Sequence, residues 1–187
     1  EHAIDWLKAG RDQDKPFFQF VCFHEPHEPI ESPPELVTEY ADVAPKPRQA
    51  DYFANVTNMD RAVGKILKAL KELNLEENTL VYFSSDNGPE TYNRHRLAFR
   101  SHGSPGPLRG MKLHLYDGGI RVPGIMRYPR ALEGGQTISE PVCALDLLPT
   151  FCELAGVELP QGRIFDGASF TSLFAGEPIQ RSKPLFW

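Results

Sequence analysis

Apolar residues gather in short runs and in one long periodic segment. The runs at 17–23 (FFQFVCF) and 79–83 (TLVYF) are rich in aromatic, aliphatic and β-branched side chains. Such runs are typical of strands covered on both faces of a parallel sheet. Between them, apolar residues recur at a helical period from 50 to 73, which predicts a helix that ends at Asn74.

The second half of the chain continues this alternation. A further strand is predicted at 120–126 and a helix at 139–155, ended by Gly156. Residues 88–120 contain six glycines and little periodicity, which is unusual inside a compact domain unless the segment is functional. Strands alternating with helices indicate an α/β layered fold with a largely parallel central sheet.

Composition narrows the class of protein. The 187 residues are 41% hydrophobic and 24% charged, as in ordinary globular proteins, and the net charge of −5 argues against a nucleic-acid partner. No apolar run approaches the ~20 residues that cross a bilayer, so no membrane partner is expected. The chain starts inside a helix-like segment and stops in a strand-like run at 183–187. We therefore expect an internal part of a longer protein.

The predicted strand at 79–83 runs almost directly into Asp86, Asn87 and Gly88. In open α/β sheets, ligands bind at the carboxyl ends of the strands. A carboxylate and an amide oxygen suit a hard cation such as Ca²⁺ or Mg²⁺. Because Ca²⁺ takes roughly 6–8 oxygens, other ligands would have to come from elsewhere. The alternative is a simple turn, for which this tripeptide is a common sequence.

His24 and His27 follow the other predicted strand in the segment HEPHEP. A histidine in such a place is more often structural than functional. His27, held between Pro26 and Pro29, could instead donate a hydrogen bond to an anion or to a leaving-group oxygen.

Lys112 lies in a glycine-rich segment with Gly110, Gly118 and Gly119. Most lysines are solvated surface charges, and that is the default interpretation. The glycines permit close approach of the backbone to a ligand, and Lys112 could supply a positive charge to an oxyanion.

The remaining polar candidates are expected to be structural. Arg109 and Arg121 are predicted ion-pair residues, with Asp117 as a partner for either. Asn55-Val56-Thr57 fits the pattern for N-glycosylation, which is frequent by chance. Three further histidines are interpreted as structural or peripheral: His95, His102 and His114.

Five blocks of the sequence together resemble one known family. In chain order they are FVCFHEPHEP, LVYFSSDNG, GPLRGMKLHLYDGGIRVPGI, LDLLPTFCELAG and DGASF. They resemble successive blocks of the type I sulfatases, which are enzymes of the alkaline phosphatase-like α/β superfamily. The similarity covers essentially all 187 residues, and the Asp-Asn-Gly and K-x-x-x-x-D-G-G-x-R-x-P blocks together are specific.

The resemblance implies a role for four residues. Asp86 and Asn87 match the two later ligands of the family's single Ca²⁺. Lys112 matches the lysine that contacts the sulfate group, and His27 matches the histidine that bonds the sulfate and assists the reaction. Asp117 stands where the family more often has Glu, which affects only a supporting position.

One part of the family's site is missing from this sequence. Sulfatases make a formylglycine nucleophile from the first residue of a Cys/Ser-x-Pro-x-Arg motif, and use an early pair of metal-binding aspartates. Neither occurs here. Residues 1–187 are therefore interpreted as the later portion of a sulfatase catalytic domain. This part alone is expected to be inactive.

The resemblance implies a calcium-dependent sulfuric ester hydrolase acting on sulfate monoesters of carbohydrates or aryl alcohols. Its partner would be a small sulfate ester or a sulfated glycan, and its location extracytoplasmic: secreted, periplasmic or lysosomal. One alternative is a phosphodiesterase or phosphonate hydrolase of the same superfamily, which commonly uses two transition metals. The other is a non-catalytic module that binds sulfated glycans. The particular substrate and the oligomeric state stay open.

Overall fold

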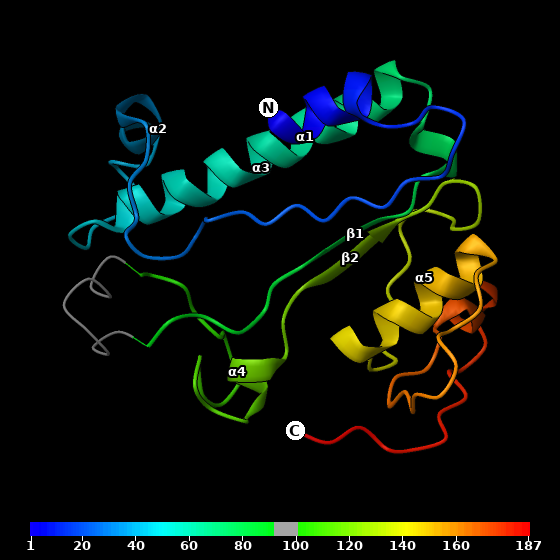
Figure 1. Ribbon diagram of the computed structural model, residues 1–187. Coiled ribbons are helices and arrows are strands. Elements are labelled where there is room, and N and C mark those ends of the chain that lie inside the picture. Colours follow the sequence, from blue (N-terminus) through cyan, green and yellow to red (C-terminus); the bar gives the residue numbers. More distant parts are fainter. Residues whose placement is uncertain (92–100) are drawn as a thin grey trace.

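The computed structural model describes residues 1–91 and 101–187, so His95 lies outside the described residues (Figure 1). Its helices are α1 (His2–Asp5), α2 (Pro34–Glu39), α3 (Gln49–Glu72), α4 (Asp117–Ile120) and α5 (Leu147–Ala155). Further helical turns, of 3-10 or π type, lie at Trp6–Gly10, Glu76–Asn78, Ala144–Asp146 and Thr171–Ala175. In this part of the chain, no helix has the length and apolar character needed to span a membrane.

Helix α3 is the longest element, and it confirms the prediction from apolar periodicity. Asn74 follows it with a φ of 56°, the left-handed geometry that commonly ends helices. Helix α2 packs near the start of α3 and α1 lies along its later half (Figure 1). Leu36 of α2 and Leu7, in the helical turn that follows α1, are buried to 2% and 1% exposure. Burial of an apolar face, more than helix propensity, stabilises such an element.

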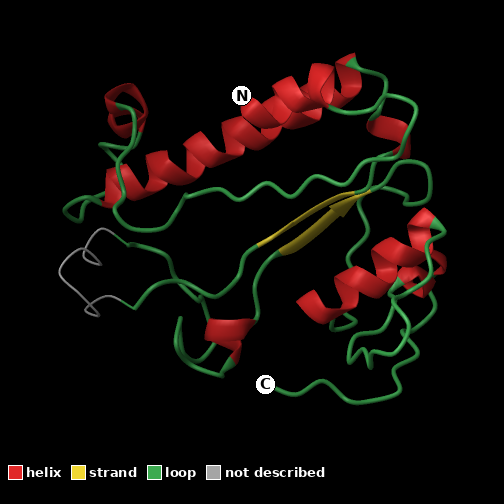
Figure 2. Ribbon diagram, viewed as in Figure 1, coloured by secondary structure: helices red, strands yellow, loops and turns green. Residues whose placement is uncertain are grey.

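The two strands form one antiparallel pair (Figure 2). Strand β1 (Val81–Ser84) pairs with β2 (Gly124–Arg127), with Tyr82 opposite Met126. The prediction of a largely parallel central sheet is therefore wrong for the described residues. The consequence for the site is direct. Antiparallel pairing puts the loop that follows β1 beside the loop that precedes β2.

Residues 17–23 are extended but form no strand in the described part of the chain. They run between α3 and β1 in Figure 1. Alternate side chains are exposed, with Phe18 at 70% and Phe20 at 80%. This is the period of a strand, without the ladder of hydrogen bonds that defines one. The buried strand predicted here is thus observed as an extended segment with one uncovered face.

A second packed unit surrounds α5, which is shorter than predicted. Pro149 lies in the first turn of α5, where a missing N–H costs nothing, and this favours a start at Leu147 and not at 139. Gly156 ends α5 with a φ of 66°, as predicted. The nearby core contains Phe170 and Leu173, with Met126 of β2 packed against it.

Candidate functional site

Strand β1 leads directly into the Asp-Asn-Gly loop (residues 85–91). Ser85 Oγ donates to the Asn87 carbonyl at 3.0 Å, and Asn87 Nδ2 donates to the Gly88 carbonyl at 2.8 Å. The amide oxygen Oδ1 is left as the other polar atom of Asn87. Asp86 is exposed, and its carboxylate has no hydrogen bond or ion pair within the described residues. The turn is therefore held by groups other than the Asp86 carboxylate.

The lysine loop (residues 108–122) lies against the Asp-Asn-Gly loop. Gly88 N donates to the Gly119 carbonyl at 2.8 Å, and Lys112 N donates to the Pro89 carbonyl at 2.9 Å. These backbone hydrogen bonds follow from the antiparallel pairing, which brings the two loops together. Asn87 and Lys112 therefore belong to one locally bonded substructure.

The glycines serve this contact between loops. A Cβ at Gly88 would lie 1.9 Å from the Gly118 carbonyl oxygen, and one at Gly118 would lie 2.1 Å from the Gly110 oxygen. Real Cβ atoms do not approach so closely. In the structure the close approach predicted for Gly118 and Gly119 is to other backbone, whereas a Cβ at Gly110 would lie 3.0 Å from Cβ of His114.

Lys112 is largely buried, which excludes the interpretation as a solvated surface charge. Its side chain is 17% exposed, and Nζ lies 3.6 Å from Oε2 of Glu90, whose side chain is 12% exposed. Sequence reasoning missed Glu90. Its position three residues after Asn87, in a loop already marked as a candidate site, was the only available signal.

His27 lies on the histidine loop (residues 24–30), with its side chain exposed. Its Nδ1 is 2.6 Å from the Glu28 carbonyl oxygen, and its ring centroid is 5.9 Å from that of His24. Since a carbonyl only accepts, Nδ1 carries the proton in this contact. The other ring nitrogen, Nε2, is then the atom that can accept a proton or, in the imidazolium, donate one.

The histidine loop reaches the other two loops through residues 101–103. The Glu28 side chain, 7% exposed, accepts a hydrogen bond from Ser101 Oγ at 3.1 Å. Two residues later, a Cβ at Gly103 would lie 2.8 Å from Cβ of Pro89. The loops that carry His27, Asn87 and Lys112 are thus joined in series.

Arg109, Arg121 and Asp117 make structural contacts, and the partner of Arg109 differs from the one predicted. Asp117 pairs with Arg121, as predicted, at 3.9 Å between exposed side chains. Arg109 was also expected in an ion pair, and its guanidinium instead lies 3.8 Å from the centroid of the Tyr116 ring. Stacking of this kind is common for Arg because its planar group matches an aromatic face.

Two of the other histidines in the described part contact backbone. His102 Nε2 lies 3.1 Å from the Pro47 carbonyl oxygen, and His114 Nδ1 lies 3.2 Å from that of Met111. These contacts agree with the structural role expected for both.

Asn55 is unsuited to glycosylation. It is 3% exposed, and Nδ2 donates to the Glu31 carbonyl at 3.1 Å. A glycan acceptor must project from the surface, so the sequence pattern at Asn55 is a chance match in this conformation.

The described residues offer a hard cation only part of a ligand set. In residues 1–91 and 101–187, no three His, Cys, Asp or Glu side chains are grouped closely enough to hold a metal ion. Asp86 and Asn87 are neighbours in the loop that follows β1, and each carries a side-chain oxygen. Oxygen donors of this kind fit Ca²⁺ or Mg²⁺ and not a thiolate-preferring metal.

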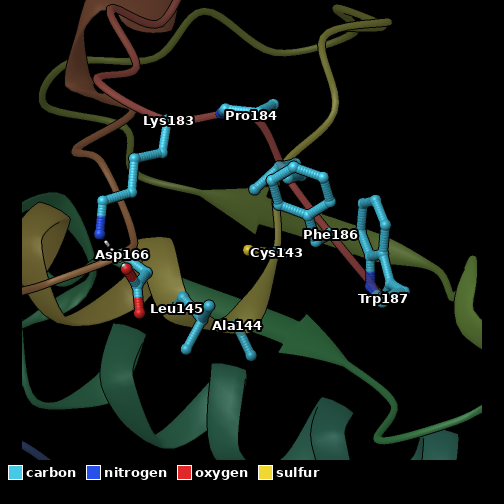
Figure 3. Close-up of a pocket in the computed structure, with 9 residues that line it drawn as sticks. Cys143, Ala144, Leu145, Asp166, Lys183, Pro184, Phe186 and Trp187 are labelled. Carbon is cyan, nitrogen blue, oxygen red and sulfur yellow. Dashed lines mark hydrogen bonds and ion pairs between the residues drawn. The ribbon is translucent and has the colours of Figure 1, made fainter.

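A cavity of about 510 Å³ lies elsewhere in the molecule, between Cys143–Leu145 and the segment 183–187. Figure 3 shows the ion pair of Lys183 and Asp166 at one end, 2.7 Å apart, and the rings of Phe186 and Trp187 at the other. None of the predicted site residues lines this cavity.

A match to a solved structure shows that the chain has part of an alkaline phosphatase-like fold. Ps i-CgsB in complex with k-i-k-neocarrahexaose matches with a TM-score of 0.82 at 30% sequence identity, over 95% of this chain and 38% of that chain.

This chain belongs to the sulfatase family, as the resemblance predicted. The family model described as Sulfatase matches residues 1–157. The chain is 38% identical to steryl-sulfatase of Rattus norvegicus over 98% of its length, and 33% identical to a sulfatase of Formosa agariphila over 99%. It spans 30% and 35% of the lengths of those two relatives.

Proposed function

We propose that this chain forms the part of a sulfuric ester hydrolase that clamps the sulfate group and contributes two ligands to a single Ca²⁺. The observation that carries the proposal is the position of Lys112. The side chain is 17% exposed, on a loop that is hydrogen bonded to the loop of Asp86 and Asn87. A largely buried ammonium group suits an anion, and a sulfate monoester is the anion that the family hydrolyses.

Asp86 and Asn87 would hold the cation through carboxylate and amide oxygens. The Asp86 carboxylate, which is exposed, and the Asn87 amide, which is oriented by its hydrogen bond to the Gly88 carbonyl, fit that role. When bound, Ca²⁺ supplies a fixed positive charge that stabilises negative charge on sulfate oxygens. Mg²⁺ is a possible substitute with the same donor preference.

Lys112 would place an ammonium group against a sulfate oxygen. Attack on the sulfur of a sulfate ester increases the charge on its oxygens. A donor that is already in place stabilises that charge without reorganisation. The partly buried position strengthens the interaction, because the surroundings screen charge less than water does.

His27 would act at the leaving-group oxygen. Its Nδ1 proton is committed to the Glu28 carbonyl, so Nε2 is the atom available to the substrate. A protonated Nε2 can donate to the oxygen that leaves as the sulfur–oxygen bond breaks. The covalent nucleophile that the family requires, a formylglycine, would come from a part of the protein outside these 187 residues.

The proposed substrate class is a sulfate monoester of a carbohydrate or an aryl alcohol. The relative solved in complex with k-i-k-neocarrahexaose supports the carbohydrate part of this class. Sulfatases of this type act outside the cytoplasm, and we propose the same for this protein.

The test uses the full-length protein that contains this chain. Lys112→Ala is expected to lower kcat on an aryl sulfate by about 10²–10³-fold, the usual cost of removing an oxyanion-stabilising donor. Lys68→Ala is the matched control, because Lys68 is 76% exposed in a surface ion pair with Glu72. It should leave kcat unchanged. Equal activity of both variants would overturn the role of Lys112.

Metal analysis of the same protein separates the alternatives. One Ca²⁺ per chain, lost in Asp86→Ala together with activity, supports the sulfatase. Two zinc or manganese ions would favour the phosphodiesterase reading. A protein that binds a sulfated glycan through Lys112 and turns over no sulfate ester would be the binding module.

A further inference from the structure

The carboxylate of Glu90 contacts both Thr91 and Lys112. Oε1 accepts hydrogen bonds from the backbone N and the Oγ1 of Thr91, at 2.8 Å and 3.1 Å. Oε2 is 3.6 Å from Nζ of Lys112. The first contact orients the carboxylate, and the second presents its other oxygen to the ammonium group.

The backbone fixes the same two residues. Lys112 N donates to the carbonyl of Pro89, the neighbour of Glu90, at 2.9 Å. The ion pair and the backbone hydrogen bond therefore hold the two segments at adjacent points. Both side chains are under one-fifth exposed. A partly buried ion pair of this kind is screened less than one in open solvent.

We propose that Glu90 is a positioning residue that holds the Lys112 ammonium in the orientation needed for catalysis. This inference rests on the proposed function, in which Lys112 contacts the sulfate. A lysine side chain has four flexible carbons and a compact charge, so it does not orient itself. Glu90 restricts that freedom before the substrate arrives, which lowers the cost of reaching the transition state.

The Glu90 carboxylate has a second effect, and it lets kinetic measurements distinguish a positioning role from a structural one. Its negative charge repels a bound sulfate group and so weakens binding of the substrate in the ground state. The same carboxylate orients the Lys112 ammonium group for the transition state. Removal of the charge should therefore lower kcat without raising KM. A residue that only maintains the loop would behave differently, because a disordered loop weakens binding and raises KM.

The experiment compares Glu90→Gln with wild type in the full-length protein. We expect kcat to fall about 10-fold, and inorganic sulfate to inhibit a few-fold more tightly because one like charge is gone. Glu90→Asp, which keeps the charge, should retain more of kcat. Glu72→Gln is the control, since Glu72 is 55% exposed in the surface pair with Lys68, and it should change neither quantity.

A double-mutant cycle with Lys112→Ala decides between positioning and general structure. If Glu90 acts on the chemical step through Lys112, then Glu90→Gln lowers kcat no further once Lys112 is Ala, while sulfate still inhibits more tightly because the charge is gone. Fully additive losses, or a raised KM with weaker inhibition by sulfate, would overturn the inference. These results differ from failure of the proposed function, which would appear as full activity in Lys112→Ala alone.

Discussion

At the scale of single residues, Asp146 shows how burial and charge combine. Its side chain is fully buried, and both oxygens face the Arg181 guanidinium at 2.7 Å and 2.8 Å. The backbone N–H groups of Ala168 and Cys143 donate to the same carboxylate at 2.9 Å and 2.8 Å. Burial by itself would raise the pKa of Asp146. The Arg181 guanidinium and these N–H groups outweigh burial and hold the pKa below its usual value.

This network predicts a loss of stability in acid. Because the folded-state pKa of Asp146 is lowered, its contribution is fully present above the ordinary value of 3.8 and is lost as pH falls through the folded-state pKa. Asp146→Asn should reduce the free energy of unfolding at neutral pH by about 3 kcal/mol, since it leaves Arg181 without a buried counter-charge. Denaturant unfolding between pH 7 and pH 3 measures both effects.

Asp166→Asn is the control for that prediction. Asp166 pairs with Lys183 at 2.7 Å, but its side chain is 64% exposed. Exposed pairs contribute roughly 0–1 kcal/mol. If Asp166→Asn lowered the free energy of unfolding as much as Asp146→Asn does, the buried network at Asp146 would contribute no more than an exposed ion pair.

At the scale of elements, two loops are held together by backbone packing. Strand pairing aligns the end of β1 with the start of β2, and the Asp-Asn-Gly and lysine loops continue from those ends. The two loops touch at Gly88 and Gly118, where the backbones are too close for either residue to carry a Cβ atom. The relative position of Asn87 and Lys112 depends on these glycines as much as on the functional side chains.

Gly88→Ala should therefore separate the loops. Its Cβ would meet the Gly118 carbonyl at 1.9 Å, and overpacking of this kind costs typically 1–3 kcal/mol. We expect a lower midpoint of thermal unfolding and a loss of sulfate ester turnover in the full-length protein. Gly64→Ala is the matched control. Gly64 lies in α3 with open space around it, so alanine should stabilise by roughly 0.5–1 kcal/mol. Equal melting temperatures for Gly88→Ala and Gly64→Ala would contradict the claim that Gly88 is needed for the contact between the loops.

At the scale of the whole molecule, the chain corresponds to only part of the length of its sulfatase relatives. It spans 30% of the length of the rat steryl-sulfatase that it matches. The extended segment at 17–23 leaves Phe18 and Phe20 uncovered, and its backbone makes no sheet with β1 in the described residues. Asp86 and Asn87 are likewise too few to complete the coordination of a calcium ion.

The 187-residue chain by itself should hydrolyse no aryl sulfate, whereas the full-length protein should. The physical reason is that the proposed clamp stabilises charge but includes no group for covalent attack on sulfur. Release of the phenol, followed by absorbance for both proteins at equal concentration, measures this. Turnover by the short chain would place the nucleophile within it and contradict the proposed division of the site.

Much of the secondary structure was predictable because local signals set it. The apolar period of α3, the left-handed residue after it and Gly156 after α5 all depend on near neighbours in the chain. The motifs were also local, and they identified the family that the comparisons then confirmed. The pairing of strands was not predictable in this way, because strand direction depends on contacts that are distant in sequence.

The sequence by itself determined the family, the positions of the main helices and the candidates Asp86, Asn87, Lys112 and His27. Only the tertiary structure decided that β1 and β2 run antiparallel, that Asn55 is buried and that Lys112 faces Glu90. The reason is physical. Periodicity and motifs depend on residues that are close along the chain, whereas burial and ion pairing depend on which distant segments fold against each other.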